Sequence, residues 1–535
     1  MAATVRANVA EREATTSVLV TRLIQVIVFT GGMSSIGIEL TASRLIAPFF
    51  GSSTFIWANL IGLTLTFLSV GYFLGGRIAD RYPSPTLLFS ITAVAACAAG
   101  FIPIIARPIL TASLEAFDDF AVGAFYGSLV GVIVLISLPV TLLGFVSPFA
   151  IRLRVSDVSN AGITAGNLYG LSTLGSIAGS FLPVILLIPL IGTTRTFIVL
   201  AAALLVPSVV ALAAVGAVRP ASVALALLAL MIAANVAAAE GNIRPAERGR
   251  LIYEHESEAN YIQVVEDDGR FMLALNEGHA IHSIYDPSSD LTGGPWDYFM
   301  MGPLFGSGET AASTDSALLI GLAGGTVARQ LTAAYGPIPI DGVEIDADIA
   351  RVGREYFAMG PEDLPNLNVI VQDGRYMLRT SDERYDVIGI DAYHQPYIPF
   401  QLCTKEFFTE VRDHLNPGGV AVINVGRTKS DYRLVDVIAA TMRSVYPHVY
   451  AIEVEGYNNT MLVGSFDQYG LDNFAANTQA LPETSILRVV ADRSLATGDI
   501  REVSPDAQIF TDDHAPVELV VDRIILDVAR EGDDE

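Results

Sequence analysis

Cysteine is almost absent from this sequence, which contains two in 535 residues. Cys97 falls in an apolar stretch and Cys403 lies far from it, so the thiols offer neither a disulfide framework nor a metal site. His279 and His282 lie three residues apart in a predicted strand or hairpin, and His394 is isolated, so we predict that no metal is bound. A G-x-S-x-G elbow and a convincing Cys/His pair are also missing, which leaves acyl-enzyme chemistry without support.

Basic residues are scarce in the second half of the chain. Residues 1–239 contain 11 arginines, no lysine and 8 acidic residues, whereas the rest contains 21 basic and 49 acidic residues. This acidity argues against nucleic-acid binding, and it is compatible with a cationic substrate or a salt-rich milieu. We therefore predict that nucleic acid is not a partner.

Charge of either sign is nearly absent between residues 21 and 239. Apolar stretches follow one another there, and most are long enough to cross about 30 Å of hydrocarbon. We predict a polytopic α-helical membrane domain over residues 1–239 with about seven helices, and the lipid bilayer as its partner. The candidate spans are residues 23–42, 56–76, 87–105, 121–145, 165–191, 196–215 and 222–239. The small-residue runs 71–76 and 170–179 predict helix-packing faces.

Arginines near the predicted spans suggest an orientation in the cell membrane. Those before the first span and after the second and fourth spans mark these segments as cytoplasmic. They are Arg6, Arg12, Arg22, Arg77, Arg81, Arg152 and Arg154. Seven spans would then put the rest of the chain outside, in conflict with a domain built for a nucleoside made in the cytosol. We therefore expect span 222–239, or a broken helix near Gly31 and Gly32, to be wrong, and the catalytic domain to be cytoplasmic.

A glycine-rich turn begins the second half of the chain. Residues 317–346 (ALLIGLAGGTVARQLTAAYGPIPIDGVEID) predict a strand, a turn, a helix and a second strand that ends on Glu344. Gly321, Gly324 and Gly325 allow a sharp turn and the close approach of a ligand. An acid about 20 residues further on can accept hydrogen bonds from both ribose hydroxyls. The turn lacks the full G-x-G-x-x-G spacing and a P-loop lysine, so a nucleoside with a short tail is favoured over a dinucleotide or triphosphate.

Two later strands also end in acids. Residues 369–373 (VIVQD) end at Asp373, which is followed by Gly374, and residues 385–391 (YDVIGID) end at Asp391. Ligands of open parallel sheets lie beyond the carboxyl ends of the strands, so these acids and the glycine turn should converge on one crevice. A further helix and strand predict a doubly wound, Rossmann-like α/β domain. They cover residues 404–415 and 420–425.

Several motifs together resemble the polyamine aminopropyltransferases, the spermidine synthases. In chain order they are NYIQVVED (260–267), LALNEGHAIHS (273–283), WDYFMMGPL (296–304), LIGLAGGT, VEID, VQDGR, YDVIGIDAYHQPYIPF and EFF (406–408). Joined to SRLIAPFFGSS (43–53) and GYFLGGRIADR (71–81), they resemble the membrane-fused, spermidine synthase-like proteins of prokaryotes. The resemblance implies a small β-hairpin domain at 250–290, a Rossmann-like catalytic domain at 291–470, and a C-terminal extension with an acidic tail at 471–535.

The resemblance also implies roles for individual residues. The family binds decarboxylated S-adenosylmethionine, with its glycine loop at Gly321, Gly324 and Gly325 beside the sulfonium tail. Glu344 then falls on the ribose, Asp373 with Gly374 on the adenine, and Asp391 is the base that accepts the proton of the amine. The candidate residues for the acceptor are Gln263, Tyr298, Tyr393 and His394.

Two departures from the family pattern leave alternatives open. Gly324 replaces an Asp of the glycine loop, and His394 replaces the second Asp of the catalytic motif. Each lost charge-assisted hydrogen bond is worth roughly 1.5–3 kcal/mol, so a diamine should bind less well and intact S-adenosylmethionine becomes plausible. We place aminopropyl transfer to an amine such as putrescine first. S-adenosylmethionine-dependent methylation of an amine or a membrane-proximal acceptor, and a non-enzymatic sensor or transport role, remain alternatives. Assembly into a homo-oligomer is left open.

Overall fold

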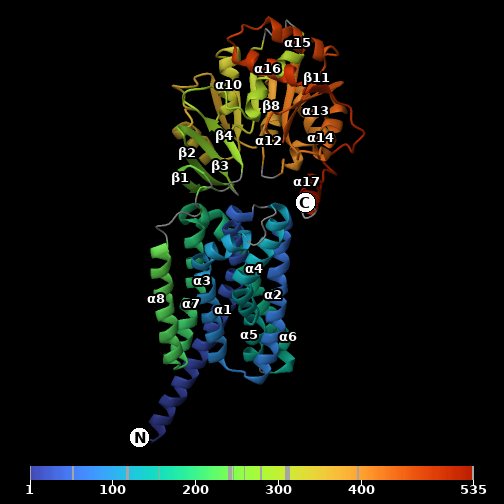
Figure 1. The fold of residues 1–535 in the computed structure, drawn as a ribbon. Coiled ribbons are helices and arrows are strands. Elements are labelled where there is room, and N and C mark those ends of the chain that lie inside the picture. The colour runs from blue at the N-terminus through green and yellow to red at the C-terminus, as the bar shows by residue number, and fades with distance from the viewer. Residues whose placement is uncertain are drawn as a thin grey trace. The chain divides into compact units, whose positions relative to one another are not determined.

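Two compact units make up the chain, Met1–Arg244 and Pro245–Glu535. The computed structural model describes residues 2–50, 54–115, 120–155, 157–238, 244, 246, 248–257, 259–276, 280–307, 314–393 and 397–532. The first unit is helical, and the second is built on two sheets, whose strands can be followed in Figure 1.

The first unit contains six helical runs that are long and apolar enough to cross a membrane. Its helices are α1 (Ala2–Phe50), α2 (Thr54–Arg81), α3 (Pro85–Glu115), α4 (Phe120–Gly144), α5 (Val146–Arg154), α6 (Ala161–Phe181), α7 (Ile188–Ala214) and α8 (Val218–Ala238), with a 3₁₀ turn η1 (Val158–Asn160) before α6 and a π-helical turn η2 (Leu182–Leu187) before α7. Helix α1 continues through Gly31 and Gly32, and α8 is present. Neither of the two suspected errors in the predicted spans is therefore found.

The predicted fifth and sixth spans lie in one run, Val158–Ala214. The run is interrupted at Gly192, where φ is +78°. Before this point α6 runs parallel to α1, because Gly175 packs against Phe29 and Gly179 against Met33. After it α7 runs antiparallel to α1, as the next contacts show. The run therefore reverses direction and contributes two arms, as the two predicted spans require.

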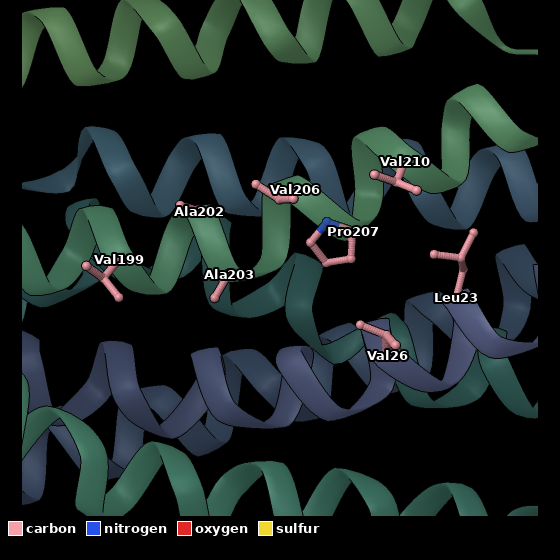
Figure 2. A pocket seen from close by; sticks show the side chains of 8 residues that line it. All are labelled: Leu23, Val26, Val199, Ala202, Ala203, Val206, Pro207 and Val210. Atoms are coloured by element: carbon pink, nitrogen blue, oxygen red, sulfur yellow. The ribbon is translucent and has the colours of Figure 1, made fainter.

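Helix α7 follows α1 in the opposite direction along an apolar groove. Near one end of the pair, Ser34 donates a hydrogen bond to the carbonyl of Leu200 (3.2 Å). Near the other end, Leu23 and Val26 of α1 lie opposite the later residues of α7 (Figure 2). The groove has a volume of about 550 Å³. It is lined by Leu23, Val26, Val199, Ala202, Ala203, Val206, Pro207 and Val210. No side chain of this lining could bind a polar substrate.

Small residues bring the helices of this unit close together. A Cβ at Gly71 of α2 would lie 2.2 Å from the carbonyl oxygen of Thr141, and one at Gly175 of α6 would lie 2.0 Å from that of Phe29. Real side chains do not approach so closely, so these positions need glycine. The predicted packing faces at 71–76 and 170–179 are therefore confirmed at these positions.

The two ends of α1 differ in what surrounds them. Arg154, which ends α5, donates to the Thr21 hydroxyl (2.8 Å), and Arg152 pairs with Asp80 of α2 (3.0 Å). At the other end, Arg244 donates to the carbonyl of Pro48 (2.8 Å). The chain thus leaves the helical unit at the end of α1 opposite the arginines of α2 and α5.

The second unit begins with a four-stranded antiparallel sheet in the order β1-β2-β3-β4. Its strands are β1 (Arg250–Glu256), β2 (Tyr261–Asp267), β3 (Arg270–Leu275) and β4 (Ile281–Tyr285). They fall within residues 250–290, where a β-hairpin domain is expected. One face of this sheet packs on the following domain, because Ile262 and Leu273 share a core with Ile349 and Phe357.

An eight-stranded sheet follows, in the order β12-β10-β11-β9-β8-β5-β6-β7. Its strands are β5 (Ala317–Ile320), β6 (Ile340–Glu344), β7 (Leu367–Val371), β8 (Tyr385–Ile390), β9 (Leu415–Gly426), β10 (His448–Glu453), β11 (Asn459–Ser465) and β12 (Ile500–Glu502). Strands β7, β6, β5, β8 and β9 are parallel neighbours, and β11, β10 and β12 add antiparallel pairs. In chain order, β6 and β7 are added on one side of β5, and β8 then pairs with β5 on its other side. Strands β5 and β8 therefore flank the switch point, where ligands bind in such sheets.

Helices cover both faces of this sheet, as the predicted doubly wound arrangement requires. Leu318 and Ile320 of β5 face one core, whereas Ala317 and Leu319 face the other, because successive strand residues point to opposite sides. The helical elements are η3 (Pro295–Phe305), α10 (Thr326–Tyr335), α11 (Ala347–Tyr356), α12 (Gly374–Thr380), η4 (Phe400–Leu402), α13 (Lys405–Asp413), α14 (Arg433–Arg443), α15 (Gly470–Ala480), α16 (Ile486–Thr497) and α17 (Val517–Gly532).

The expected C-terminal extension at 471–535 is part of this domain. Phe474 of α15 and Leu487 of α16 are buried in the core around η3, and β12 pairs with β10. Val517 and Val521 of α17 enter the opposite core. The domain thus continues well beyond residue 470, because these apolar side chains complete both of its cores.

Candidate active site

The glycine turn and Asp391 meet at the switch point of the large sheet. Gly321 follows β5 with φ at +89°, and a Cβ there would lie 2.5 Å from the carbonyl oxygen of Asp391. The backbone N–H of Asp391 donates to the carbonyl of Ile320 (2.9 Å). Only glycine accommodates both this φ and this close approach. The predicted convergence of the turn with Asp391 is therefore present.

Glu344 lies at the end of β6, on the other side of β5. Its carboxylate accepts hydrogen bonds from the backbone N–H of Ala323 (2.9 Å), in the glycine turn, and from that of Asp346 (3.1 Å). Ala323 has a positive φ of +48°, a conformation uncommon for alanine, and this turns its N–H toward the acid. Burial raises the pKa of Glu344 to about 7, against the opposing effect of the two N–H donors. The side chain is only 6% exposed.

Asp373 and Gly374 lie one strand further along the same edge. Asp373 caps α12, because its Oδ1 accepts from the backbone N–H of Tyr376 (2.9 Å). A Cβ at Gly374 would lie 2.4 Å from a methyl group of Ile320, so the start of α12 packs closely on the end of β5. Asp391, Gly321, Glu344 and Asp373 thus follow one another along the carboxyl edges of β8, β5, β6 and β7.

The Asp391 carboxylate is held by neutral donors. Asn424 of β9 donates from Nδ2 to Oδ1 of Asp391 (3.0 Å), and the side chain of Trp296 in η3 is a second donor. Burial raises the pKa of Asp391 to about 6, while these two hydrogen bonds act in the opposite direction. The group is therefore mainly ionised at pH 7 and can accept a proton.

Three of the four predicted acceptor residues lie in the described part of the chain. The Tyr393 hydroxyl donates to the carbonyl of Asn424 (2.9 Å) and accepts from the N–H of Gly426 (2.8 Å), so it braces β9. Burial raises its pKa. The Tyr298 hydroxyl accepts from the N–H of Glu455 (3.1 Å). Burial raises the pKa of Tyr298 as well.

The other two predicted acceptor residues are less informative. Gln263 lies on β2, where its Nε2 donates to the Tyr261 hydroxyl (2.8 Å), so this contact stays within the small sheet. His394 lies outside the described residues. Among the four, Tyr393 is the one that the structure brings next to Asp391.

The small sheet is hydrogen-bonded to the glycine turn. Ser283 of β4 accepts from the N–H of Gly324 (2.8 Å). A Cβ at Gly324 would lie 2.9 Å from Ser283 and 3.0 Å from Phe357. An acidic side chain at this position, as in the related motif, has no room in this arrangement. Asn260 also donates to Asp346, directly after β6 (2.9 Å).

Three large apolar side chains stand exposed near the ends of β6 and β7. Ile345 is 62% exposed, Val371 49% and Tyr376 of α12 56%. They follow or flank Glu344 and Asp373. Apolar groups in this position offer a surface on which a flat heterocycle can stack.

A cluster of charges supports the start of α12. Arg375 is 8% exposed at its side chain, and it pairs with Glu410 of α13 (2.8 Å) and with Asp512 (2.7 Å). Asp512 also accepts from the Thr404 hydroxyl (2.7 Å). Asp512 lies on the surface and ties the C-terminal segment to the helix that follows Asp373.

Sequence reasoning missed the two donors to Asp391. Asn424 carries the only polar side chain between Val420 and Val425, an otherwise apolar strand, and this isolated amide was the available signal. Trp296 begins the motif WDYFMMGPL, but its contact with Asp391 could not be predicted because the indole reaches Asp391 through the packing of η3. In the described part of the chain, no group of three or more His, Cys, Asp or Glu residues could hold a metal ion.

Residues 307–466 match the family model described as spermine/spermidine synthase domain. A probable polyamine aminopropyl transferase of Bifidobacterium longum is 35% identical over 298 residues, which are 52% of this chain and 65% of the relative. The polyamine aminopropyltransferase of Vibrio vulnificus is 30% identical over 211 residues, 38% of this chain and 69% of the relative. This chain thus spans about two thirds of the length of these relatives.

Solved structures with a similar chain course include two further proteins. A probable spermidine synthase from Corynebacterium glutamicum is 22% identical, with a TM-score of 0.39, over 49% of this chain and 96% of that chain. The spermidine synthase from Thermotoga maritima is 18% identical, with a TM-score of 0.36, over 46% of this chain and 88% of that chain.

Proposed function

This chain belongs to the polyamine aminopropyltransferase family. We therefore propose that its second unit, Pro245–Glu535, here called the soluble unit, transfers an aminopropyl group from decarboxylated S-adenosylmethionine to a small cationic amine such as putrescine. The observation that carries this proposal is the meeting of Asp391 with the glycine turn at the switch point, beside the buried Glu344. A base, a turn that admits a ligand, and an acid for a ribose follow one another there along a single edge.

The donor fits this edge by its length and its polar groups. Neighbouring strands lie about 4.8 Å apart, so Asp391 and Asp373 stand roughly 14 Å from each other, with Gly321 and Glu344 between them. A carboxylate offers about four acceptor positions, and the backbone N–H groups of Ala323, Asp346 and Ile345 use part of those of Glu344. The remaining capacity can accept a hydrogen bond from the ribose. Ile345 and Tyr376 provide apolar surface for the adenine near Asp373.

The chemical step needs one base. The lone pair of the amine attacks the propyl carbon that is bonded to the sulfonium sulfur, the carbon–sulfur bond breaks, and its electron pair stays on sulfur in the departing thioether nucleoside. The attacking nitrogen then carries an extra proton, which Asp391 accepts. Its pKa of about 6 keeps it ionised at neutral pH and therefore ready for this transfer.

The reaction can be tested with the full-length protein in detergent. Decarboxylated and intact S-adenosylmethionine are titrated by calorimetry, and each is then incubated with putrescine while spermidine and the thioether nucleoside are measured by mass spectrometry. We expect both products from the decarboxylated donor and their loss in Asp391→Asn, with donor binding retained. Binding of the intact form alone, without spermidine, would instead favour methyl transfer. Binding of neither donor would favour the sensor or transport role.

We further propose that the helical unit anchors the protein in the cell membrane as a multi-pass domain. The six apolar runs support this proposal by their length and composition. The end of α1 near Arg152 and Arg154 is the more suitable cytoplasmic end, because arginines in short loops are retained on that side. Self-association and the absence of nucleic-acid binding stay predictions.

The exit of the chain at Arg244, beside Pro48, supports a soluble unit on the side opposite the cytoplasm. This differs from the side expected from the supply of nucleosides. We give the arginines more weight, because they set orientation during insertion, whereas long domains are translocated largely regardless of their charge. Arg44, Arg107 and Arg195 lie toward the exit end within helices, and Arg244, Arg248 and Arg250 follow the last helix there and favour the opposite orientation. The nucleoside donor then has to be present on that side.

A further inference from the structure

A relay of amide side chains leads to the Asp391 carboxylate. Asn459, which begins β11, donates from Nδ2 to Oδ1 of Asn424 (2.9 Å). Asn424 in turn donates from Nδ2 to Oδ1 of Asp391 (3.0 Å). The order of donors is fixed along the relay, because the ionised carboxylate can only accept and the Asn424 oxygen must therefore face Asn459.

We propose that Asn424 is a positioning residue for aminopropyl transfer: held by Asn459, it fixes the rotation of the Asp391 carboxylate. This inference rests on the proposed function and extends it to residues that do not touch the substrate. Asn424 engages Oδ1 of Asp391 and Trp296 is the second donor, so the acceptor positions that these two leave open receive the proton of the amine. A carboxylate that turned freely would present these positions for only part of the time, and proton transfer depends on such alignment.

The burial of Asn424 is otherwise hard to explain. It is 5% exposed in a strand whose neighbours Val422, Ile423 and Val425 are fully buried apolar residues. A buried amide costs free energy unless it is hydrogen-bonded, and an apolar residue would suit this strand at no such cost. Both polar groups of the Asn424 side chain take part in the relay. Nδ2 donates to Asp391 and Oδ1 accepts from Asn459, so the relay explains why an amide is buried here.

The other described groups around the Asp391 carboxylate are neutral, so the relay is its main polar contact. From η3, Trp296 donates a neutral hydrogen bond. From the segment after β8, Tyr393 is the titratable group nearby, and burial raises its pKa, so that it stays neutral through the physiological range. From β5, Gly321 presents only backbone. Among the described residues, no charged side chain is a cause of the pKa shift of Asp391.

The inference can be tested by two readouts on full-length variants in detergent. The first is the pH dependence of kcat/KM for putrescine. The second is the fluorescence of Trp296 in a Trp57→Phe background, in which Trp296 is the single tryptophan and reports the ionisation of Asp391 directly. Asn424→Ala should lower kcat/KM about tenfold or more, because a hydrogen bond to a charged group is lost, and should move both titrations to higher pH. Asn459→Ala should act in the same direction with a smaller effect.

Asn458→Ala is the matched control, since Asn458 is exposed and only its backbone carbonyl is engaged, by the N–H of Arg427. It should leave both readouts unchanged. If Asn424→Ala lowers thermal stability but shifts neither titration, the amide is merely structural and the inference is wrong. If Asn459→Ala has no effect while Asn424→Ala does, the relay is wrong. The fluorescence titration needs no turnover, so it distinguishes failure of this inference from failure of the proposed reaction.

Discussion

At the scale of single residues, Glu344 and Asp391 are both carboxylates whose pKa is raised by burial, yet their partners differ. Glu344 accepts from two backbone N–H groups that cannot move away without changing the turn. Asp391 accepts from the side chains of Asn424 and Trp296. The first arrangement suits a fixed anchor for a ligand. The second leaves a carboxylate whose proton affinity depends on side chains that can be substituted one at a time.

If Asp391 is the base, the ratio of kcat/KM between the wild type and Asp391→Asn should depend on pH. Taking the ratio cancels the titration of the amine itself, which is common to both proteins. We expect a ratio of about 10²–10⁴ at pH 8, where Asp391 is ionised, and a fall toward 1 as the pH drops through about 6. The check is kcat/KM for putrescine in steps from pH 5 to 9. A ratio that stays constant over this range would remove Asp391 from the reaction.

The raised pKa of Glu344 predicts how the folding stability depends on pH. Its pKa rises from 4.5 to about 7 on folding, so the folded state binds a proton more tightly than the unfolded state does. Its contribution to stability is therefore full below pH 4.5 and is lost as the pH rises through 7. The side chain introduced by Glu344→Gln does not titrate, so the variant does not lose this stability as the pH rises. Relative to the wild type, it should gain up to about 3 kcal/mol between pH 4.5 and pH 8.

The measurement is chemical denaturation at both pH values, followed by Trp296 fluorescence in the Trp57→Phe background. Any pH-independent cost of the amide cancels when the two pH values are compared. An equal difference between variant and wild type at pH 4.5 and pH 8 would contradict the assignment of the raised pKa.

At the scale of elements, the turn after β5 is the most constrained segment of the site. Its residues contact β4, β6 and the end of β8 through Gly324, Ala323 and Gly321. A change in the turn is therefore transmitted to Glu344, Asp391 and the small sheet together. The turn determines the geometry of the whole crevice more than any single strand does.

Gly321→Ala tests this constraint against a matched control. Gly336, at the end of α10, has a similar φ of +84° but open space around it. Alanine at either position costs about 1–2 kcal/mol for the left-handed backbone. At Gly321 it also clashes with the carbonyl of Asp391, so we expect a larger loss of stability and a large fall in kcat, which Gly336→Ala should not show. Unfolding free energies and kcat of both variants provide the check, and equal effects would contradict the close approach.

The strands around the site could be predicted because their signals are local. β5, β6, β7 and β8 are short apolar runs that end in glycine or acid, and a parallel sheet brings such ends together. Residues that act through packing could not be predicted in this way. Trp296 and Ser283 reach the site from η3 and β4 through contacts that no sequence spacing encodes.

The role of the C-terminal part could not be predicted either, because its contacts join residues that are far apart in the sequence. Residues 471–535 look like an extension because their short helices carry no motif. Phe474 and Leu487 nevertheless complete the core around η3, and Asp512 reaches Arg375 across the domain. In the helical unit, the spans were predictable from apolar length, and the reversal at Gly192 falls between the two predicted spans 165–191 and 196–215.

At the scale of the whole molecule, the ends of α1 decide which side of a membrane each end of the chain occupies. The helical unit begins beside Thr21 and Arg154 and is left beside Pro48. If this unit spans a membrane as proposed, an odd number of crossings follows, and the N-terminus and the exit at Arg244 belong on opposite sides. The charge of the soluble unit has no part in this conclusion.

Cysteine labelling in intact cells tests the orientation. The two native cysteines are buried and can be replaced by Cys97→Ala and Cys403→Ser. Tyr82→Cys, in the exposed turn between α2 and α3, should react with a membrane-impermeant maleimide only after permeabilisation. Asp382→Cys, exposed on the soluble unit, should react in intact cells. The reverse pattern would place the soluble unit in the cytoplasm, and labelling of both or neither in intact cells would contradict an odd number of crossings.

The pairing of Arg375 with Asp512 joins residues 137 positions apart, and this has a consequence for biosynthesis. The helix beside Asp373 is anchored only after the last part of the chain has left the ribosome. By then α1 to α8 have long been made, since chains are built and fold from their N-terminus. If α1 to α8 are inserted as proposed, the nascent chain enters the lipid before the pair of Arg375 and Asp512 can form, and a premature stop codon ahead of Asp512 would leave an inserted protein without this pair.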